Sequence, residues 1–130
     1  MPKTTQLTLT LTSKPGVLAQ VAKALAGSEV NIQAICAPET GTAPGKVRLL
    51  VDDPARAVAA LKAAKCRVGQ EEALALTLEN RPGALAEVAE KLARARVNIK
   101  CAYATTHGPG PALVVLTVSN VAKAETALAG

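Results

Sequence analysis

The chain has almost no aromatic residues: Tyr103 is its single tyrosine, and it contains neither phenylalanine nor tryptophan. Proteins that bind single-stranded nucleic acid usually stack the bases on exposed aromatic rings. The net charge of +5 is therefore better explained by a solvated basic surface, and we expect no nucleic-acid partner. The basic excess lies in residues 1–70, which carry nine Lys or Arg against four Asp or Glu.

Long apolar runs are also missing. No run reaches the roughly 20 residues that a transmembrane helix needs, and the opening "MPKTTQLTLT" lacks the apolar segment of a secretory signal. We therefore expect a cytoplasmic protein with no membrane partner. The hydrophobic content of 49% is nevertheless enough for a folded globular protein with a sizeable core.

The sequence offers little to metal, cofactor or catalytic chemistry. Cys36, Cys66 and Cys101 form no C-x-x-C pair, so we expect reduced thiols, no bound metal and no cofactor. The loops "APETGTAPG" and "THGPGP" lack the arrangement of a phosphate-binding loop. No pair of carboxylates in a pocket is indicated, so we assign no catalytic residue and expect a protein that is not an enzyme.

The sequence contains an internal repeat. Sliding it by 67 positions aligns residues 4–63 with 71–130 without a gap, and 25 of the 60 pairs are identical. The likeness is greatest between "LTSKPGVLAQVAKALAGSEVNI" (11–32) and "LENRPGALAEVAEKLARARVNI" (78–99). We therefore predict two copies of one structural unit, the first in residues 1–70 and the second in 71–130.

Both copies begin with a strand and a helix. The alternating stretches "QLTLTLT" (6–12) and "ALALTLE" (73–79) predict half-buried strands. Apolar residues at i, i+3, i+4 and i+7 then predict one apolar helix face in each copy. The two stripes are Leu18, Val21, Ala22 and Leu25, and Leu85, Val88, Ala89 and Leu92. Ser13 and Asn80 are suitable N-cap residues for these helices.

The remaining elements complete a βαββαβ order. "VNIQAICA" and "VNIKCAYA" predict second strands, each followed by a Gly/Pro loop, a third strand and a second helix, which starts after Asp53 or Asn120. "CRVGQ" (66–70) adds a fourth strand to the first copy. The predicted class is α+β, with antiparallel sheets covered by helices on one face. The second copy is truncated before its fourth strand, so residues 66–70 or a strand of a second chain could cover the open edge of 73–79.

This order, combined with Asn-x-Pro-Gly, the apolar stripe and Val-Asn-Ile, resembles the ACT domain, a ferredoxin-like regulatory module of amino-acid metabolism. The resemblance covers both copies. It implies a tandem pair that binds a small ligand, often an amino acid, between paired modules and acts allosterically without catalysis. The ligand-binding residues it implies are Asn80, Gly83, Ala84 and Leu85 with Asn31 and Ile32, and Ser13, Gly16, Val17 and Leu18 with Asn98 and Ile99.

The residue types at these positions suit an amino acid. Unsatisfied N–H groups at a helix start attract a carboxylate, and glycine lets the ligand approach the backbone. An asparagine amide can accept from an ammonium and donate to a carboxylate. Asn80 and Ser13 could instead only cap their helices, and Asn31 and Asn98 could simply occupy turns. Ser13 stands where the second copy has Asn80, so we expect the Asn80 site to be the stronger one.

Ligand identity stays open, because family members that bind amino acids can carry a polar residue where this chain has Leu78. The implied partners are a small-molecule ligand, a second copy of the chain in a homodimer, and a metabolic enzyme. The alternative is a ligand-free module that oligomerises or docks on such an enzyme. A small phosphatase on the same scaffold would need an anion loop, for which Lys14 and Arg81 stand near the helix starts.

Overall fold

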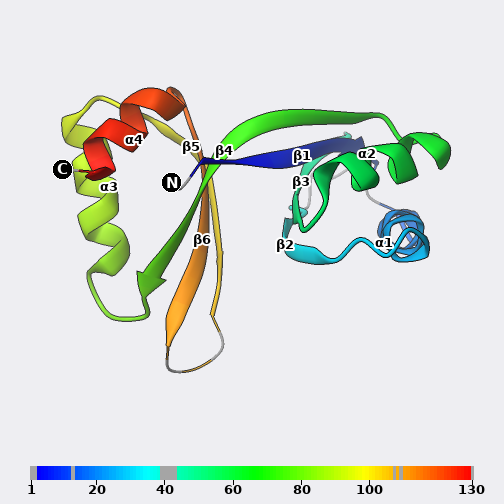
Figure 1. The fold of residues 1–130 in the computed structure, drawn as a ribbon, viewed down its shortest axis with the longest axis horizontal. Coiled ribbons are helices and arrows are strands. Elements are labelled where there is room, and N and C mark those ends of the chain that lie inside the picture. Colours follow the sequence, from blue (N-terminus) through cyan, green and yellow to red (C-terminus); the bar gives the residue numbers. More distant parts are fainter. Residues whose placement is uncertain (1–2, 13, 39–43, 107, 109, 130) are drawn as a thin grey trace. The chain divides into compact units, whose positions relative to one another are not determined.

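The computed structural model describes residues 3–12, 14–38, 44–106, 108 and 110–129. Ten elements alternate along the chain (Figure 1). They are β1 (Lys3–Leu11), α1 (Val17–Gly27), β2 (Ile32–Cys36), β3 (Gly45–Val51), α2 (Pro54–Ala63), β4 (Val68–Glu79), α3 (Ala84–Arg94), β5 (Ile99–Thr105), β6 (Pro111–Val118) and α4 (Val121–Ala129). The chain forms two compact units: Thr5–Glu71, and Glu72–Gly130 with Met1–Thr4.

The first unit has the predicted βαββαβ order. Its strands follow the order β2-β3-β1-β4, and β3 pairs antiparallel with both β1 and β2. Helices α1 and α2 pack on the same side of these strands (Figure 1). Leu7 and Leu9 of β1 meet Val21 and Leu25 of α1 in one apolar core, and α2 adds Leu61.

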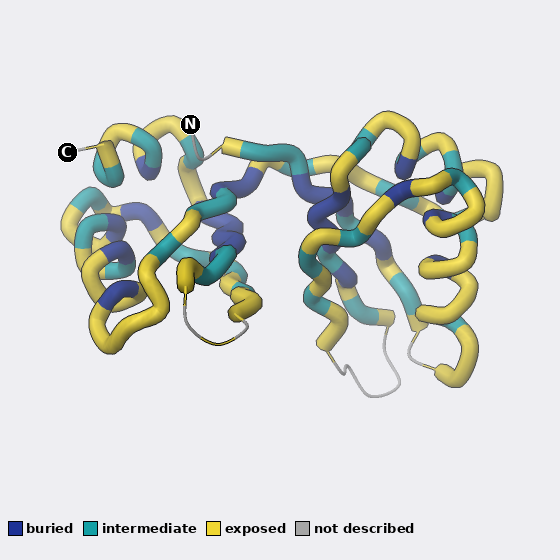
Figure 2. The backbone as a smooth tube through the Cα atoms, turned by 60° about the horizontal axis from the view of Figure 1, so that its bottom comes forward, coloured by how far each residue is buried: buried dark blue, intermediate teal, exposed yellow. Residues whose placement is uncertain are grey.

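The second unit repeats this arrangement with strands in the order β4-β6-β5. Leu74 and Leu116, which face each other across β4 and β6, are fully buried and pack against Leu92 of α3 and Ala124 of α4. In Figure 2 buried residues are interspersed with exposed ones along the chain, as expected when one face of each element packs against a core. The fold class predicted from the sequence, two ferredoxin-like modules of α+β type, is confirmed.

Strand β4 differs from the sequence-based prediction. Residues 66–70 and 73–79 were expected to form separate strands, but Val68–Glu79 is one continuous strand of 12 residues. No proline interrupts this stretch, so the alternation of side chains runs through it. Residues 66–70 therefore do not cover the edge of 73–79, because the two segments follow each other in the same strand. The start of β1 belongs to the second unit, where Lys3 Nζ lies 3.3 Å from Glu72 Oε2.

The apolar faces of α1 and α3 are rotated from the predicted stripes. Leu18 and Leu85 are 46% and 50% exposed, whereas the stripe members that enter the cores are Val21, Leu25, Val88 and Leu92. In α3 the buried residues are Ala84, Val88 and Leu92, which follow each other at intervals of four. Because Leu85 is one position from Ala84, it lies about 100° further round the helix and points out of the core.

Residues in the left-handed region end three of the helices. Glu29 and Arg96, at equivalent positions of the two copies, have φ of 57° and 59°. The next N–H, of Val30 or Val97, donates to the carbonyl of Leu25 or Leu92 at 2.9 Å, which is the pattern of a Schellman motif. The following Asn31 and Asn98 therefore do not supply the left-handed turn. Within the described part of the chain, every helix is too short or too polar to cross a membrane.

A polar cluster ties three strands of the first unit together. Glu71 Oε1 accepts hydrogen bonds from Gln6 Nε2 at 2.8 Å and from Arg48 Nε at 3.3 Å. Gln6 is fully buried, and the Arg48 and Glu71 side chains are 18% and 28% exposed. The equivalents of Gln6 and Arg48 in the second copy are Ala73 and Val115. This cluster is therefore a feature of the first copy alone, where β1, β3 and β4 meet.

We expect Glu71→Ala to lower the free energy of unfolding by about 1–3 kcal/mol, because it removes the shared acceptor of a buried amide and a partly buried guanidinium. Chemical denaturation followed by circular dichroism measures the change. Glu72→Ala is the matched control, since Glu72 is exposed and its ion pair with Lys3 should contribute less than about 1 kcal/mol. Equal losses in the two variants would show that the cluster has no special stabilising role.

Candidate functional site

The two helix starts are built by glycine. Gly16 and Gly83 are the N-cap residues of α1 and α3, both with φ of 89° in the left-handed region. The expected capping by Asn80 is therefore wrong: its Nδ2 donates instead to the carbonyl of Gly108 at 3.1 Å. Ser13 lies outside the described residues. Because the left-handed conformation strains any residue with a Cβ, the Pro-Gly dipeptide fixes the path of the chain into each helix.

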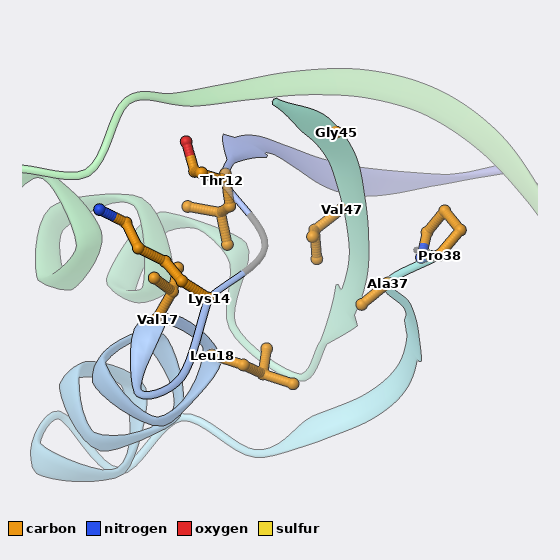
Figure 3. A pocket seen from close by; sticks show the side chains of 9 residues that line it. Thr12, Lys14, Val17, Leu18, Ala37, Pro38, Gly45 and Val47 are labelled. Carbon is orange, nitrogen blue, oxygen red and sulfur yellow. The ribbon is translucent and has the colours of Figure 1, made fainter. Parts of the chain in front are cut away.

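A cavity of about 130 Å³ opens beside the start of α1 in the first unit. It is lined by Leu11, Thr12, Lys14, Val17, Leu18, Ala37, Pro38, Gly45 and Val47, from the ends of β1 and β2 and the starts of α1 and β3. Figure 3 shows Val47 and Ala37 facing Leu18 across this space, with the amine of Lys14 at the outer end of its side chain. The cavity has an apolar interior and a cationic group at its rim.

Two of the predicted binding residues of the first copy, Val17 and Leu18, line this cavity, and Gly16 begins the helix that carries them. Asn31 and Ile32 are not among its lining residues. The Asn31 N–H donates to Asp52 Oδ1 at 3.0 Å, and Ile32 packs against the core. The sequence did not predict that Ala37, Pro38, Gly45 and Val47 line a cavity, because the Gly/Pro loop between them was interpreted only as a hairpin connection.

The equivalent residues of the second copy have matching backbone roles. The Asn98 N–H donates to Ser119 Oγ at 2.9 Å, and Ile99 packs against the core of its unit. Ala84 is buried, whereas Leu85 is half exposed. The surface by this helix start is an open depression lined by Glu79, Asn80, Arg81, Gly110 and Pro111. It is more polar than the cavity of the first unit.

Arg81 is held in this depression by two carboxylates. Its Nη2 lies 3.0 Å from Glu87 Oε2, and its Nε lies 2.9 Å from Glu79 Oε2. The hydrogen bonds to Glu87 and Glu79 both raise the pKa of the guanidinium, and the bond to Glu87 has the larger effect. The side chain also bends over the helix start, since a methyl group on Gly83 would lie 3.8 Å from Arg81 Nη1. Neither Arg81–Glu79 nor Arg81–Glu87 has the i,i+4 spacing of an ion pair along a helix, so the helical periodicity of the sequence did not predict these two pairs.

Other site chemistry is not indicated. The three cysteines are half-buried and form no disulfide. Among the residues whose positions are described, no three His, Cys, Asp or Glu side chains gather as a metal site. Among the described residues near the two helix starts, the features available to a ligand are an apolar cavity, the glycine-led starts themselves and the charges beside them.

The sequence profile of the ACT domain pair matches residues 3–129. The chain belongs to the ACT domain family. Its fold is similar to the crystal structure of protein BT0572 from Bacteroides thetaiotaomicron, with 32% identity, a TM-score of 0.90, and coverage of 98% of this chain and 87% of that one. The resemblance stated from the sequence is thereby confirmed.

Two regulatory subunits of aspartate kinase share the fold of this ACT domain pair. The ligand-free subunit from Thermus thermophilus has 20% identity and a TM-score of 0.70 over 95% of this chain and 87% of that one. The subunit from Thermus flavus has 17% identity and a TM-score of 0.65 over 98% and 93%. At these identities the likeness supports the fold alone. The search of functionally described proteins gave no match.

We expect Gly16→Ala to destabilise the ACT domain pair by about 1–2 kcal/mol, because alanine is strained at φ of 89°. No atom of the described residues lies within 4 Å of the added methyl group, so the loss is expected from the backbone and not from a clash. Gly27→Ala is the control: it lies at the end of α1, has open space for a Cβ, and should be neutral or stabilising by up to about 1 kcal/mol. Urea denaturation distinguishes the two; a neutral Gly16→Ala would contradict the expectation.

Proposed function

We propose that this ACT domain pair is a regulatory protein that binds a small aliphatic amino acid and has no catalytic activity of its own. The observation that carries the proposal is the apolar cavity of about 130 Å³ against the glycine-led start of α1. An engineered apolar cavity of about 150 Å³ holds benzene, so this one has room for a short aliphatic side chain. The adjacent helix start favours the carboxylate of the same ligand.

The partner we propose is an enzyme of amino-acid metabolism. The proposal takes its model from the regulatory subunits of aspartate kinase, whose likeness to this chain is one of fold and does not identify the enzyme. A cytoplasmic location and a homodimer belong to the same proposal. The predicted grouping of Asn80 with Asn31, and of Ser13 with Asn98, stays a prediction.

One observation favours the alternative of a module that assembles without a ligand. Leu18, Ile35 and Leu85 are large apolar side chains that are each more than two-fifths exposed. Exposed apolar side chains of this kind are common at protein interfaces. Light scattering distinguishes the two functions: an assembly module forms a dimer or larger particle whose mass does not depend on amino acids.

A thermal-shift screen of the standard amino acids tests ligand binding. At a concentration about 100 times the dissociation constant, one site should add roughly 2.7 kcal/mol of stability. Ala37→Leu should abolish the shift by filling the cavity with three more carbon atoms. Ala104→Leu, the same change at the equivalent exposed position of the second copy, should leave it intact. The proposal fails if no amino acid raises the melting temperature, or if Ala37→Leu has no effect on the shift.

A further inference from the structure

The two copies share a loop but differ in the charges around it. Gly16 and Gly83 have the same φ, and the loop cations Lys14 and Arg81 occupy equivalent positions. Arg81 pairs with Glu79 and Glu87. The first copy has Thr12 and Gln20 where these two glutamates stand. Within the described residues no carboxylate pairs with Lys14.

From this difference we infer that the ACT domain pair binds a carboxylate ligand in its first copy only, with Lys14 as the counter-ion, while the second copy is closed by its own Arg81–Glu87 pair. The inference rests on the proposed function and deepens it. Only the first copy binds, the carboxylate is the group of the ligand that is recognised, and the loop of the second copy is inhibited by a side chain of the same chain.

The geometry of the second copy supports its closure. The Glu87 carboxylate accepts two hydrogen bonds from Arg81 Nη2, at 3.2 and 3.0 Å, and so takes the place of a ligand carboxylate on that guanidinium. Glu87 also lies in the first turn of α3, where its charge complements the helix dipole. Glu79 adds a second negative charge to the wall of the depression. An incoming carboxylate would therefore meet two like charges and a cation that is already paired.

The first copy provides the opposite conditions. No atom of the described residues lies within 4 Å of a methyl group placed on Gly16, so none of their side chains covers that helix start as Arg81 covers Gly83. The first turn of α1 carries no acidic residue. Lys14 lines the apolar cavity with its stem, and its flexible four-carbon chain lets the ammonium reach a carboxylate at the rim. None of the described lining residues of the cavity is acidic, whereas Lys14 is cationic, so these residues favour the carboxylate of a ligand over its ammonium.

Exchanging the distinguishing residues between the copies tests the inference. Calorimetric titration with L-valine and with isovalerate, which lacks the amino group, should give about one site per chain for the wild type. Thr12→Glu combined with Gln20→Glu should weaken binding of both probes by roughly tenfold or more, since it places two carboxylates beside Lys14. Lys14→Gln should weaken it to a similar extent. Gln33→Glu, which adds a carboxylate at an exposed position of the first copy outside the cavity lining, should bind as the wild type does.

The reciprocal variant, Glu79→Thr with Glu87→Gln, should release Arg81 and raise the stoichiometry towards two sites per chain. Circular dichroism confirms that each variant is folded. Two sites in the wild type, or unchanged affinity in both Lys14→Gln and the double glutamate variant, would overturn this inference while leaving the proposed function in place. No binding of either probe by the wild type or the reciprocal variant would overturn the inference, and a negative amino-acid screen in addition would overturn the proposed function.

Discussion

The first module depends on one carboxylate oxygen. Glu71 Oε1 accepts from Gln6 on β1 and Arg48 on β3, and thereby binds the beginning of β4 to both of these strands. Buried polar groups are costly unless satisfied, so this cluster favours one register of β4 over the alternative registers. The same strand continues into the second unit, so β4 belongs to both units.

The duplication made most of the fold predictable, since two aligned copies of one pattern give strand and helix positions twice. Local details were less accessible. The spacing of the apolar residues predicted that Leu18 and Leu85 are buried, but both are exposed. Their exposure depends on how each helix is rotated about its axis against the sheet. Periodicity identifies an apolar face but does not determine this rotation to within one residue. Asn80 is a residue type that often caps helices, yet Gly83 of the Pro-Gly turn is the N-cap of α3. The Asn80 amide donates instead to the carbonyl of Gly108 in a neighbouring loop.

Part of the lining of the candidate cavity was predictable for the same reason. Val17 and Leu18 follow the conserved spacing of the duplicated motif and do line the cavity, whereas Ala37, Pro38 and Val47 reach it only through the folding of the sheet. The charges on which the inference about the two loops rests lie at positions where the copies differ. A repeat comparison draws attention to identical residues, but identical residues such as the Pro-Gly pair maintain the shared backbone. Differences in charge can give two otherwise equal loops different roles.

Strand β4 contributes side chains to both cores. Val68 packs against the core of the first unit, and Leu76 and Leu78 pack against the core of the second. Side chains on one face of a strand recur at every second residue, so a residue inserted between Leu76 and Leu78 would turn one of them out of the second core. No linker separates the part of β4 that belongs to the first unit from the part that belongs to the second. Neither unit can therefore be excised from the chain at this point without taking part of a strand from the other.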